Sequence, residues 1–252
     1  MNLKNNIVGI LGVGEVGSSL LPIIKKQYTV LVKDLNRDEI GDTKLDVLHI
    51  CIPYSDMFED IVLAQIKQSD PDLVIIDSTL PLLTTEKIAE KTSIPLVHSP
   101  IRGTHPGMTE DLLKFMKFIG PTTKEAGVMA KEYYDALGIQ TTVLSSSRET
   151  EMGKLLDTTY YALCIAWHQE MERWCEEFGI LFDEAVTLFN KTYNEGYRES
   201  KPNVLRPVLA PGFIGGHCLM PNIELLKKTF KSPFLKIIEE SNETKKKKSK
   251  HE

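Results

Sequence analysis

The chain has 252 residues, of which 42% are hydrophobic and 26% are charged, and its formal net charge is −5. This length is enough for one large domain or two modest ones, and the acidic balance gives no indication of nucleic acid as a partner. No apolar run approaches the length that spans a bilayer, and the four cysteines are widely spaced without a CxxC pair. We therefore expect a cytoplasmic protein with reduced thiols and no membrane partner.

The first predicted strand, Ile7 to Leu11, is followed at once by the glycine pattern GVGEVG and then by helical spacing up to residue 26. A strand, a glycine turn and a helix in this order are typical of a dinucleotide-binding unit. Asp34 ends the next strand, where a carboxylate can hold the adenosine ribose and favours NAD over NADP. Lys33 and Arg37 moderate that preference, and a solvated turn aspartate is the alternative. The residues expected at the cofactor's pyrophosphate are Gly12, Val13, Gly14, Glu15, Val16 and Gly17.

Further alternation follows along the chain. The runs at 46–52 and 72–77 are continuously apolar, as in parallel strands that are covered on both faces. A third short strand is predicted at 95–99, a helix at 125–137 and a last strand at 139–144. This pattern predicts an α/β fold over residues 1–147, a Rossmann-like doubly wound and mostly parallel sheet that binds NAD.

The pattern changes to all-helical after residue 147. Residues 149–178 form a long stretch without proline whose apolar positions recur every three or four residues. Such a helix must bury its stripe against a second helix or a second subunit. Shorter helices are predicted at 183–193 and 223–230, so we expect an all-α domain over 148–232, which is a dimerisation domain if the stripe packs against a second subunit. The end of the chain, SNETKKKKSKHE, has no apolar residue, and we predict a disordered tail over 233–252.

Five segments in a fixed order resemble the UDP-glucose/GDP-mannose dehydrogenase family. They are GILGVGEVG with VLVKDLN, DVLHICIPYS, DSTLP, EMGKLLDTTYYALCIAWHQEMERWCEEFGI and PGFIGGHCLMP. The resemblance extends to about residue 230, and we expect the chain to lack the family's separate C-terminal nucleotide-sugar-binding domain. It implies NAD as the cofactor, a small-molecule substrate such as a sugar nucleotide, and a homodimer formed through the long helix 149–178.

The resemblance also implies roles for single residues. Cys218 matches the thiol nucleophile, and Lys154 matches the lysine that stabilises negative charge on the substrate oxygen. Pro53 and Thr79 would border the nicotinamide. In the family, hydride transfer turns a primary alcohol into an aldehyde, the thiolate attacks it, and a second hydride transfer leaves a thioester that water hydrolyses. On residue chemistry alone, Cys218 could also be a packed thiol and Lys154 a surface lysine.

The substrate would meet the glycine loop and one arginine. Glycines permit close backbone approach to a ligand, so we expect substrate contacts at Gly215, Gly216 and the neighbouring His217. Arg102 could pair with a carboxylate or phosphate, and a structural arginine bonded to loop carbonyls is the alternative.

The chain departs from the family at three positions. Thr158 stands where the family has an asparagine, Asn222 where it has an aspartate, and Ile101 where it has a glutamate. Because carboxylates that activate water are missing, we hypothesise altered chemistry that involves Cys218, Lys154, Thr158 and Asn222. Two alternatives remain: a β-hydroxyacid-type dehydrogenase or imine reductase that needs no cysteine, and a non-catalytic protein that binds NAD or a nucleotide sugar. His98, His105 and His217 match no zinc spacing, so no metal is expected.

Overall fold

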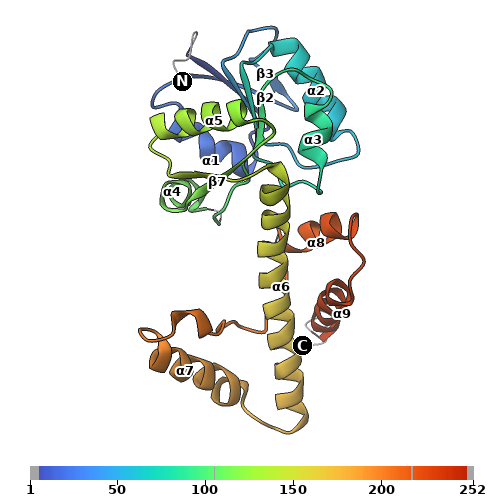
Figure 1. Cartoon of the computed structure of the whole chain (residues 1–252). Coiled ribbons are helices and arrows are strands. Elements are labelled where there is room, and N and C mark those ends of the chain that lie inside the picture. Colours follow the sequence, from blue (N-terminus) through green and yellow to red (C-terminus); the bar gives the residue numbers. More distant parts are fainter. Residues whose placement is uncertain (1–5, 105, 217, 249–252) are drawn as a thin grey trace. The chain divides into compact units, whose positions relative to one another are not determined.

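The computed structural model describes residues 6–104, 106–216 and 218–248. The chain divides into two compact units, Met1–Lys154 and Leu155–Glu252. The division falls within one long helix, α6 (Ser147–Glu177), which supplies the last residues of the first unit and the first residues of the second (Figure 1). None of the helices in the described ranges is long and apolar enough to cross a lipid bilayer.

The first unit is built around one sheet. Within the described residues it has eight strands in the order β3-β2-β1-β4-β5-β6-β7-β8. The strands are β1 (Ile7–Leu11), β2 (Thr29–Asp34), β3 (Arg37–Asp38), β4 (Val47–Ile50), β5 (Leu73–Ile76), β6 (Leu96–His98), β7 (Lys117–Pro121) and β8 (Thr141–Val143). All neighbours are parallel except the pairs β2–β3 and β6–β7. The predicted mostly parallel, Rossmann-like sheet is confirmed.

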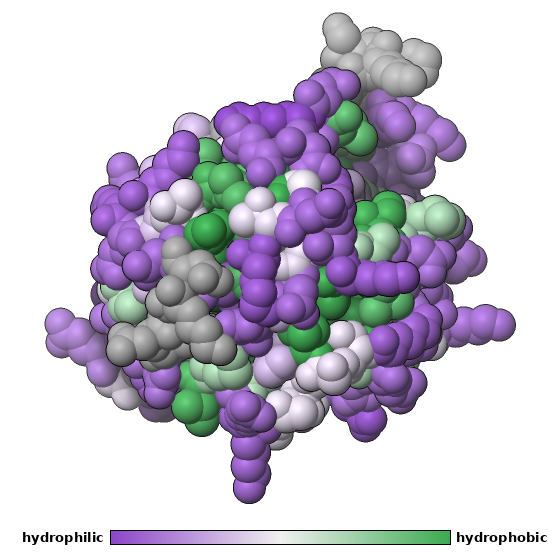
Figure 2. All heavy atoms as spheres, turned by 90° about the horizontal axis from the view of Figure 1, so that it is seen from above, coloured by the Kyte–Doolittle hydropathy of each residue, from purple (hydrophilic) through white to green (hydrophobic). Residues whose placement is uncertain are grey.

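Helices cover both faces of this sheet (Figure 1). They are α1 (Glu15–Ile24), α2 (Phe58–Ser69), α3 (Thr84–Ala89), α4 (Met108–Lys114) and α5 (Lys124–Ala136). One core cluster joins β1 to apolar residues of α1 and α5, and a second joins the sheet to Phe58 and Val62 of α2 and Ile88 of α3. Strands β4 and β5 are fully buried between these layers, and apart from His49 their residues are apolar. Hydrophilic side chains dominate the face seen in Figure 2, with apolar ones in separate areas between them.

Strand β7 and helix α4 are absent from the sequence prediction. The sequence of β7, KFIGP, contains a lysine, a glycine and a proline, so it lacks the apolar pattern of the other core strands. Gly120 has a packing role, because a Cβ there would lie 2.1 Å from the hydroxyl of Thr150 and 2.8 Å from the Cα of Ser147. A glycine at this point therefore lets the first turn of α6 lie directly against the strand.

The second unit is helical, as predicted. After α6 it contains a π-helical turn η1 (Asp183–Leu188), α7 (Phe189–Tyr197), a short 3-10 turn η2 (Pro202–Val204), α8 (Leu219–Lys227) and α9 (Pro233–Lys248). Helix α6 covers nearly the whole range predicted for it. Helix α8 begins four residues before the predicted start at residue 223, directly after Cys218.

The predicted disorder over 233–252 is wrong for residues 233–248, which form α9. Leu235 and Ile238 are buried at a spacing of three, so the helix has an apolar side. The lysines beyond them are engaged as well, because Lys245 lies 2.5 Å from Glu172 of α6 and Lys248 pairs with Glu176. A charged segment without apolar residues is thus held by its apolar neighbours upstream and by ion pairs.

Ile238 carries much of this attachment, because its side chain is fully buried. We expect Ile238→Ala to lower the free energy of unfolding by about 2 to 4 kcal/mol. Both tryptophans of the chain lie in α6, so tryptophan fluorescence during urea unfolding reports on this unit. The control Lys236→Ala removes an exposed side chain of the same helix and is expected to cost less than about 0.5 kcal/mol. Equal effects of the two variants would contradict the packing of α9.

Candidate cofactor and active site

The turn between β1 and α1 is built from glycines that the packing requires. Gly12 has φ +94°, and a Cβ there would lie 2.9 Å from the carbonyl of Cys51. A Cβ at Gly17 would lie 2.0 Å from the carbonyl oxygen of Gly12. Around Gly14, by contrast, no described atom lies within 4 Å of such a Cβ. The backbone at the start of α1 is thus tightly folded on its inner side and open on its outer side, which suits a pyrophosphate.

Asp34 reaches this turn from the end of β2. Its carboxylate accepts the backbone N–H of Val13 at 2.6 Å and that of Leu35 at 2.7 Å. These two hydrogen bonds lower the pKa of Asp34, so the exposed carboxylate is ionised at neutral pH. The nearby cations are engaged elsewhere: Lys33 lies 2.8 Å from Asp38, and Arg37 lies 2.6 Å from Glu39.

The loops after β4 and β5 are joined by one hydroxyl group. Ser78 donates to the carbonyl of Ile52 at 2.6 Å and lies 3.2 Å from that of Ile50. The two strands are parallel neighbours, so their carboxyl ends meet at one edge of the sheet. Pro53, which is exposed, and Thr79, which is half-buried, directly follow the joined residues.

Buried His98 connects the loop after β5 to the first turn of α6. Its Nε2 lies 3.0 Å from the Ser78 carbonyl, and its Nδ1 lies 2.8 Å from the Thr150 hydroxyl. Burial lowers the pKa of His98 to about 4, and the positive charges of Lys117 and Lys154 act in the same direction. The imidazole is therefore neutral, and because a carbonyl only accepts, Nε2 carries the proton.

Glu151 makes a second connection one residue further along α6. Its buried carboxylate accepts the Leu83 N–H at 2.6 Å, the Thr85 N–H at 2.8 Å and the Thr85 hydroxyl at 2.6 Å. Burial raises the pKa of Glu151 despite these donors. Leu83 has φ +72°, a strained conformation that this contact helps to hold. Half-buried Lys154 follows one turn later on the same helix.

A charged cluster lies in the core below these loops. The Asp77 carboxylate is 2.7 Å from Nδ1 of His49 and 3.0 Å from Nζ of Lys117, which also donates to the Ser99 carbonyl at 2.7 Å. The second ring nitrogen of His49 lies 2.9 Å from the Tyr133 hydroxyl. Burial alone would raise the pKa of Asp77, but the positive charge of Lys117 and the contact with His49 bring it below its ordinary value. The sequence pattern places His49 inside a predicted strand and Asp77 at the end of another, and it predicts no strand at Lys117, so it does not indicate that the three side chains meet.

In the second unit, Cys218 is exposed and immediately precedes α8. Asn222, one turn into that helix, is buried and donates from its amide to the Thr158 hydroxyl at 3.2 Å. Thr158 in turn donates to the Leu155 carbonyl at 3.1 Å. Two of the three positions at which the chain departs from the family pattern therefore contact each other. They form a pair without formal charge beside the thiol-bearing turn.

The remaining predicted residues are placed as follows. Gly215 and Gly216 are exposed in the loop before Cys218, and Gly216 has φ +81°. The guanidinium of Arg102 packs over the rings of Phe115 and Phe118, at 5.6 and 5.4 Å from their centroids. His217 and His105 lie outside the described residues, and in the described part no group of three metal-ligating side chains converges.

Residues 148–244 match the sequence profile of the UDP-glucose/GDP-mannose dehydrogenase family, central domain. This range contains Lys154, Thr158, Cys218 and Asn222, and it includes most of α9. This matched range belongs to that family. The resemblance predicted from the five motifs is thereby confirmed.

Curated relatives match a longer part of the chain than the 148–244 range. UDP-N-acetyl-D-mannosamine dehydrogenase of Methanococcus maripaludis is 30% identical over 179 residues, which are 69% of this chain and 39% of that protein. The enzyme of that name from Methanocaldococcus jannaschii is 34% identical over 152 residues, which are 59% and 33% of the two chains. The chain thus spans well under half the length of these UDP-glucose/GDP-mannose dehydrogenase relatives.

Solved structures agree on the fold. The UDP-D-ManNAc dehydrogenase from Pyrococcus horikoshii superimposes with a TM-score of 0.81 at 21% identity, covering 94% of this chain and 68% of that one. The 3-hydroxyisobutyrate dehydrogenase from Mycobacterium tuberculosis gives 0.67 at 12% identity and covers 96% and 92%. At these identities the likeness to the dehydrogenases is a statement about the fold alone.

Proposed function

We propose that the chain is an NAD-dependent oxidoreductase that acts on an alcohol group of a sugar nucleotide, with Cys218 as the nucleophile. The observation that carries this proposal is the family match over 148–244, which includes both the thiol-bearing turn and Lys154. The relatives named as UDP-N-acetyl-D-mannosamine dehydrogenases suggest the substrate class. The four cysteines are free, which accords with a cytoplasmic location.

The first unit offers a fitting cradle for the cofactor. The open side of Gly14 and the start of α1 would hold the pyrophosphate, and ionised Asp34 would accept hydrogen bonds from the ribose hydroxyls. A 2′-phosphate would meet this carboxylate, and the Lys33 and Arg37 cations are occupied by Asp38 and Glu39, so NAD is favoured over NADP. When bound, NAD supplies a hydride acceptor.

The chain's own residues would handle the substrate. The ammonium of Lys154 would stabilise negative charge that develops on the substrate oxygen, and the Cys218 sulfur would bond to the carbonyl carbon of the aldehyde. The Thr158–Asn222 pair can donate hydrogen bonds but cannot take up a proton at neutral pH. Ile101 is a buried apolar side chain and supplies no base either. We therefore propose that hydrolysis of a thioester is slow and that oxidation stops short of the acid.

The test is an oxidation assay with the purified chain. UDP-N-acetylmannosamine and a panel of sugar nucleotides and simple alcohols are incubated with NAD or NADP, and absorbance at the reduced-nicotinamide band is followed. Mass spectrometry of the product then separates aldehyde from acid. We expect reduction of NAD in preference to NADP, with an aldehyde or an enzyme-bound thioester as the main product. Rapid formation of the uronate would contradict the altered chemistry, and no reduction with any alcohol would contradict the activity.

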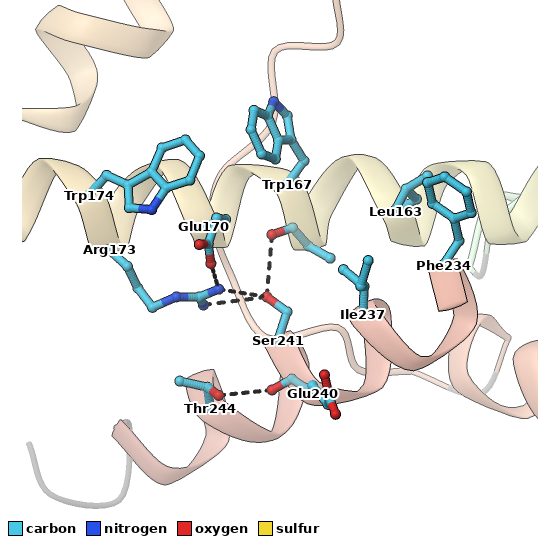
Figure 3. Close-up of a pocket in the computed structure, with 11 residues that line it drawn as sticks. Leu163, Trp167, Glu170, Arg173, Trp174, Phe234, Ile237, Glu240, Ser241 and Thr244 are labelled. Carbon is cyan, nitrogen blue, oxygen red and sulfur yellow. Dashed lines mark hydrogen bonds and ion pairs between the residues drawn. The ribbon is translucent and has the colours of Figure 1, made fainter. Parts of the chain in front are cut away.

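We also propose that the chain forms a homodimer through α6. Helix α6 exposes Leu156, Tyr160, Trp167 and Trp174, and Phe178, directly after its end, is exposed as well. In Figure 3, Trp167 and Trp174 project from α6 beside a groove of about 550 Å³ that Phe234 and Ile237 of α9 also line. A row of large apolar side chains along one helix is typical of an interface, and the family resemblance implies a second copy as its occupant.

Trp174 offers a test of this dimer, because its ring is 48% exposed and lies edge-on to Trp167 at 5.3 Å. We expect Trp174→Glu to weaken self-association at least about 30-fold, since buried aromatic anchors carry much of the binding energy of an interface. Sedimentation velocity over a concentration series measures the change against the 28.4 kDa mass of one chain. Val128→Glu, at an exposed position of α5, is the control. A wild-type chain that stays monomeric at high concentration would exclude the dimer.

A further inference from the structure

The glycine-rich loop before Cys218 is held by a buried side chain of α9. Asn242 is 3% exposed. Its amide oxygen accepts the backbone N–H of Ile214 at 2.7 Å, and its amide nitrogen donates to the Ile214 carbonyl at 2.9 Å. Both polar groups of one side chain are thus engaged by the two backbone groups of one residue. This arrangement fixes Ile214 in position and in orientation.

A second contact holds the same loop from α6. Gln169 is fully buried, donates from its amide to the Gly212 carbonyl at 2.7 Å, and accepts from the Ser241 hydroxyl at 2.8 Å. Ser241 precedes Asn242 on α9, and Figure 3 shows it directed towards α6 and Arg173. Helix α9, helix α6 and the loop are therefore joined in one hydrogen-bonded network inside the second unit.

The loop has little side-chain anchoring of its own. Gly212, Phe213, Gly215 and Gly216 are exposed, and Ile214 is the buried residue among the described positions 212–216. Glycines also carry the largest conformational freedom to be restricted. Cys218 follows Ile214 by four residues and is itself exposed. Helix α8 holds the thiol from the C-terminal side, and on the N-terminal side its position depends on contacts that the loop receives from other elements.

We propose that Asn242 is a positioning residue that sets the Cys218 loop for catalysis. The proposal rests on the function proposed above, in which the Cys218 sulfur must approach a carbonyl carbon. Reaction at that atom is sensitive to displacements of about 1 Å. Helix α9 thereby acquires a role beyond packing: its buried face aligns the nucleophile by way of the Ile214 backbone.

Asn242→Ala tests the proposal in the full chain. We expect kcat to fall about 10- to 100-fold while KM for NAD stays within about threefold, because the residues proposed to hold NAD lie in the other unit. Amide hydrogen exchange at Ile214 is expected to accelerate at least about tenfold. Glu243→Ala, at the exposed next position, should change neither quantity.

A second control separates positioning from stability. Leu235→Ala removes a buried apolar side chain of α9 but none of the loop's hydrogen bonds. Measured well below both unfolding midpoints, it is expected to lower stability and leave kcat near the wild-type value. If Asn242→Ala does not fold, Asn242→Asp retains the acceptor for Ile214 and loses the donor. A smaller loss of kcat is then expected.

Three results would overturn the proposal. The first is an unchanged kcat in Asn242→Ala, and the second is an equal loss of kcat in Leu235→Ala. The third is an unchanged rate of amide exchange at Ile214, which would show that Asn242 does not protect the Ile214 N–H. A wild-type chain that oxidises no alcohol would contradict the proposed function instead, and the exchange measurement, which needs no substrate, would still decide whether Asn242 holds the loop.

Discussion

Cys218→Ser is expected to lower kcat by at least about 1,000-fold when the proposed function holds. A serine hydroxyl is a far weaker nucleophile than a thiol at neutral pH, and it occupies almost the same space. Cys218 is exposed at the start of α8, so the substitution disturbs no buried packing. Binding of NAD, followed by quenching of protein fluorescence, should remain unchanged because the cofactor residues are proposed to lie in the first unit.

The same variant discriminates between the possible activities. A β-hydroxyacid-type dehydrogenase uses the helix lysine without a thiol, so turnover would persist in Cys218→Ser and disappear in Lys154→Ala. A chain that binds NAD but reduces none in any variant would be a binding protein. Cys164→Ser, which alters a thiol on α6, is the matched control and should retain full activity.

Lys117→Met is expected to lower the free energy of unfolding by about 3 to 5 kcal/mol. The substitution removes the cation beside the buried Asp77 carboxylate, which keeps its contacts with His49 and the Cys51 thiol, and removing one partner of a buried ion pair is costly. It also removes the donor to the Ser99 carbonyl. Urea unfolding followed by far-ultraviolet circular dichroism measures the change in this unit.

The pH dependence gives this prediction a direction. In the folded chain the pKa of Asp77 lies below its ordinary value, so its ion pairs add stability above the unfolded pKa and lose it as pH falls through the folded pKa. In Lys117→Met the principal cause of the lowered Asp77 pKa is absent. The loss of stability on acidification should therefore be smaller than in the wild-type chain. Lys131→Met, which breaks an exposed pair with Asp135, should cost less than about 0.5 kcal/mol. If Lys117→Met lowered the free energy of unfolding as little as Lys131→Met, the buried cluster would not be an important source of stability.

Periodicity and glycine spacing sufficed to predict the architecture, for physical reasons that the structure makes plain. The buried strands β4 and β5 are apolar apart from His49 because both faces of the sheet are covered, and α6 is recognisable by its length. Gly12 and Gly17 of the β1–α1 turn stand where a Cβ would collide, and Gly12 also has a positive φ. In contrast, β7 carries a lysine that is buried through its partner Asp77, and α9 is held by residues distant in sequence.

The candidate site was predictable only in part. Motif position leads to Cys218, Lys154 and Asp34, but the contact between Thr158 and Asn222 joins residues 64 positions apart. His98, Glu151 and Asn242 were not identified as site residues because each acts on backbone groups of a distant loop. Backbone groups are nearly the same for every residue type. A side chain that bonds to them therefore has no partner side chain that could be recognised in the sequence.

The close contact at Gly120 has a consequence for protein engineering. Because a side chain at that position would occupy the space of the Thr150 hydroxyl, strand β7 and the start of α6 are matched surfaces. A chimera that joins α6 to a dinucleotide-binding sheet from another protein must therefore inherit this glycine. Otherwise the helix would start displaced outward, and Thr150 would no longer reach His98. The unit suitable for transplantation is thus the helix together with its strand.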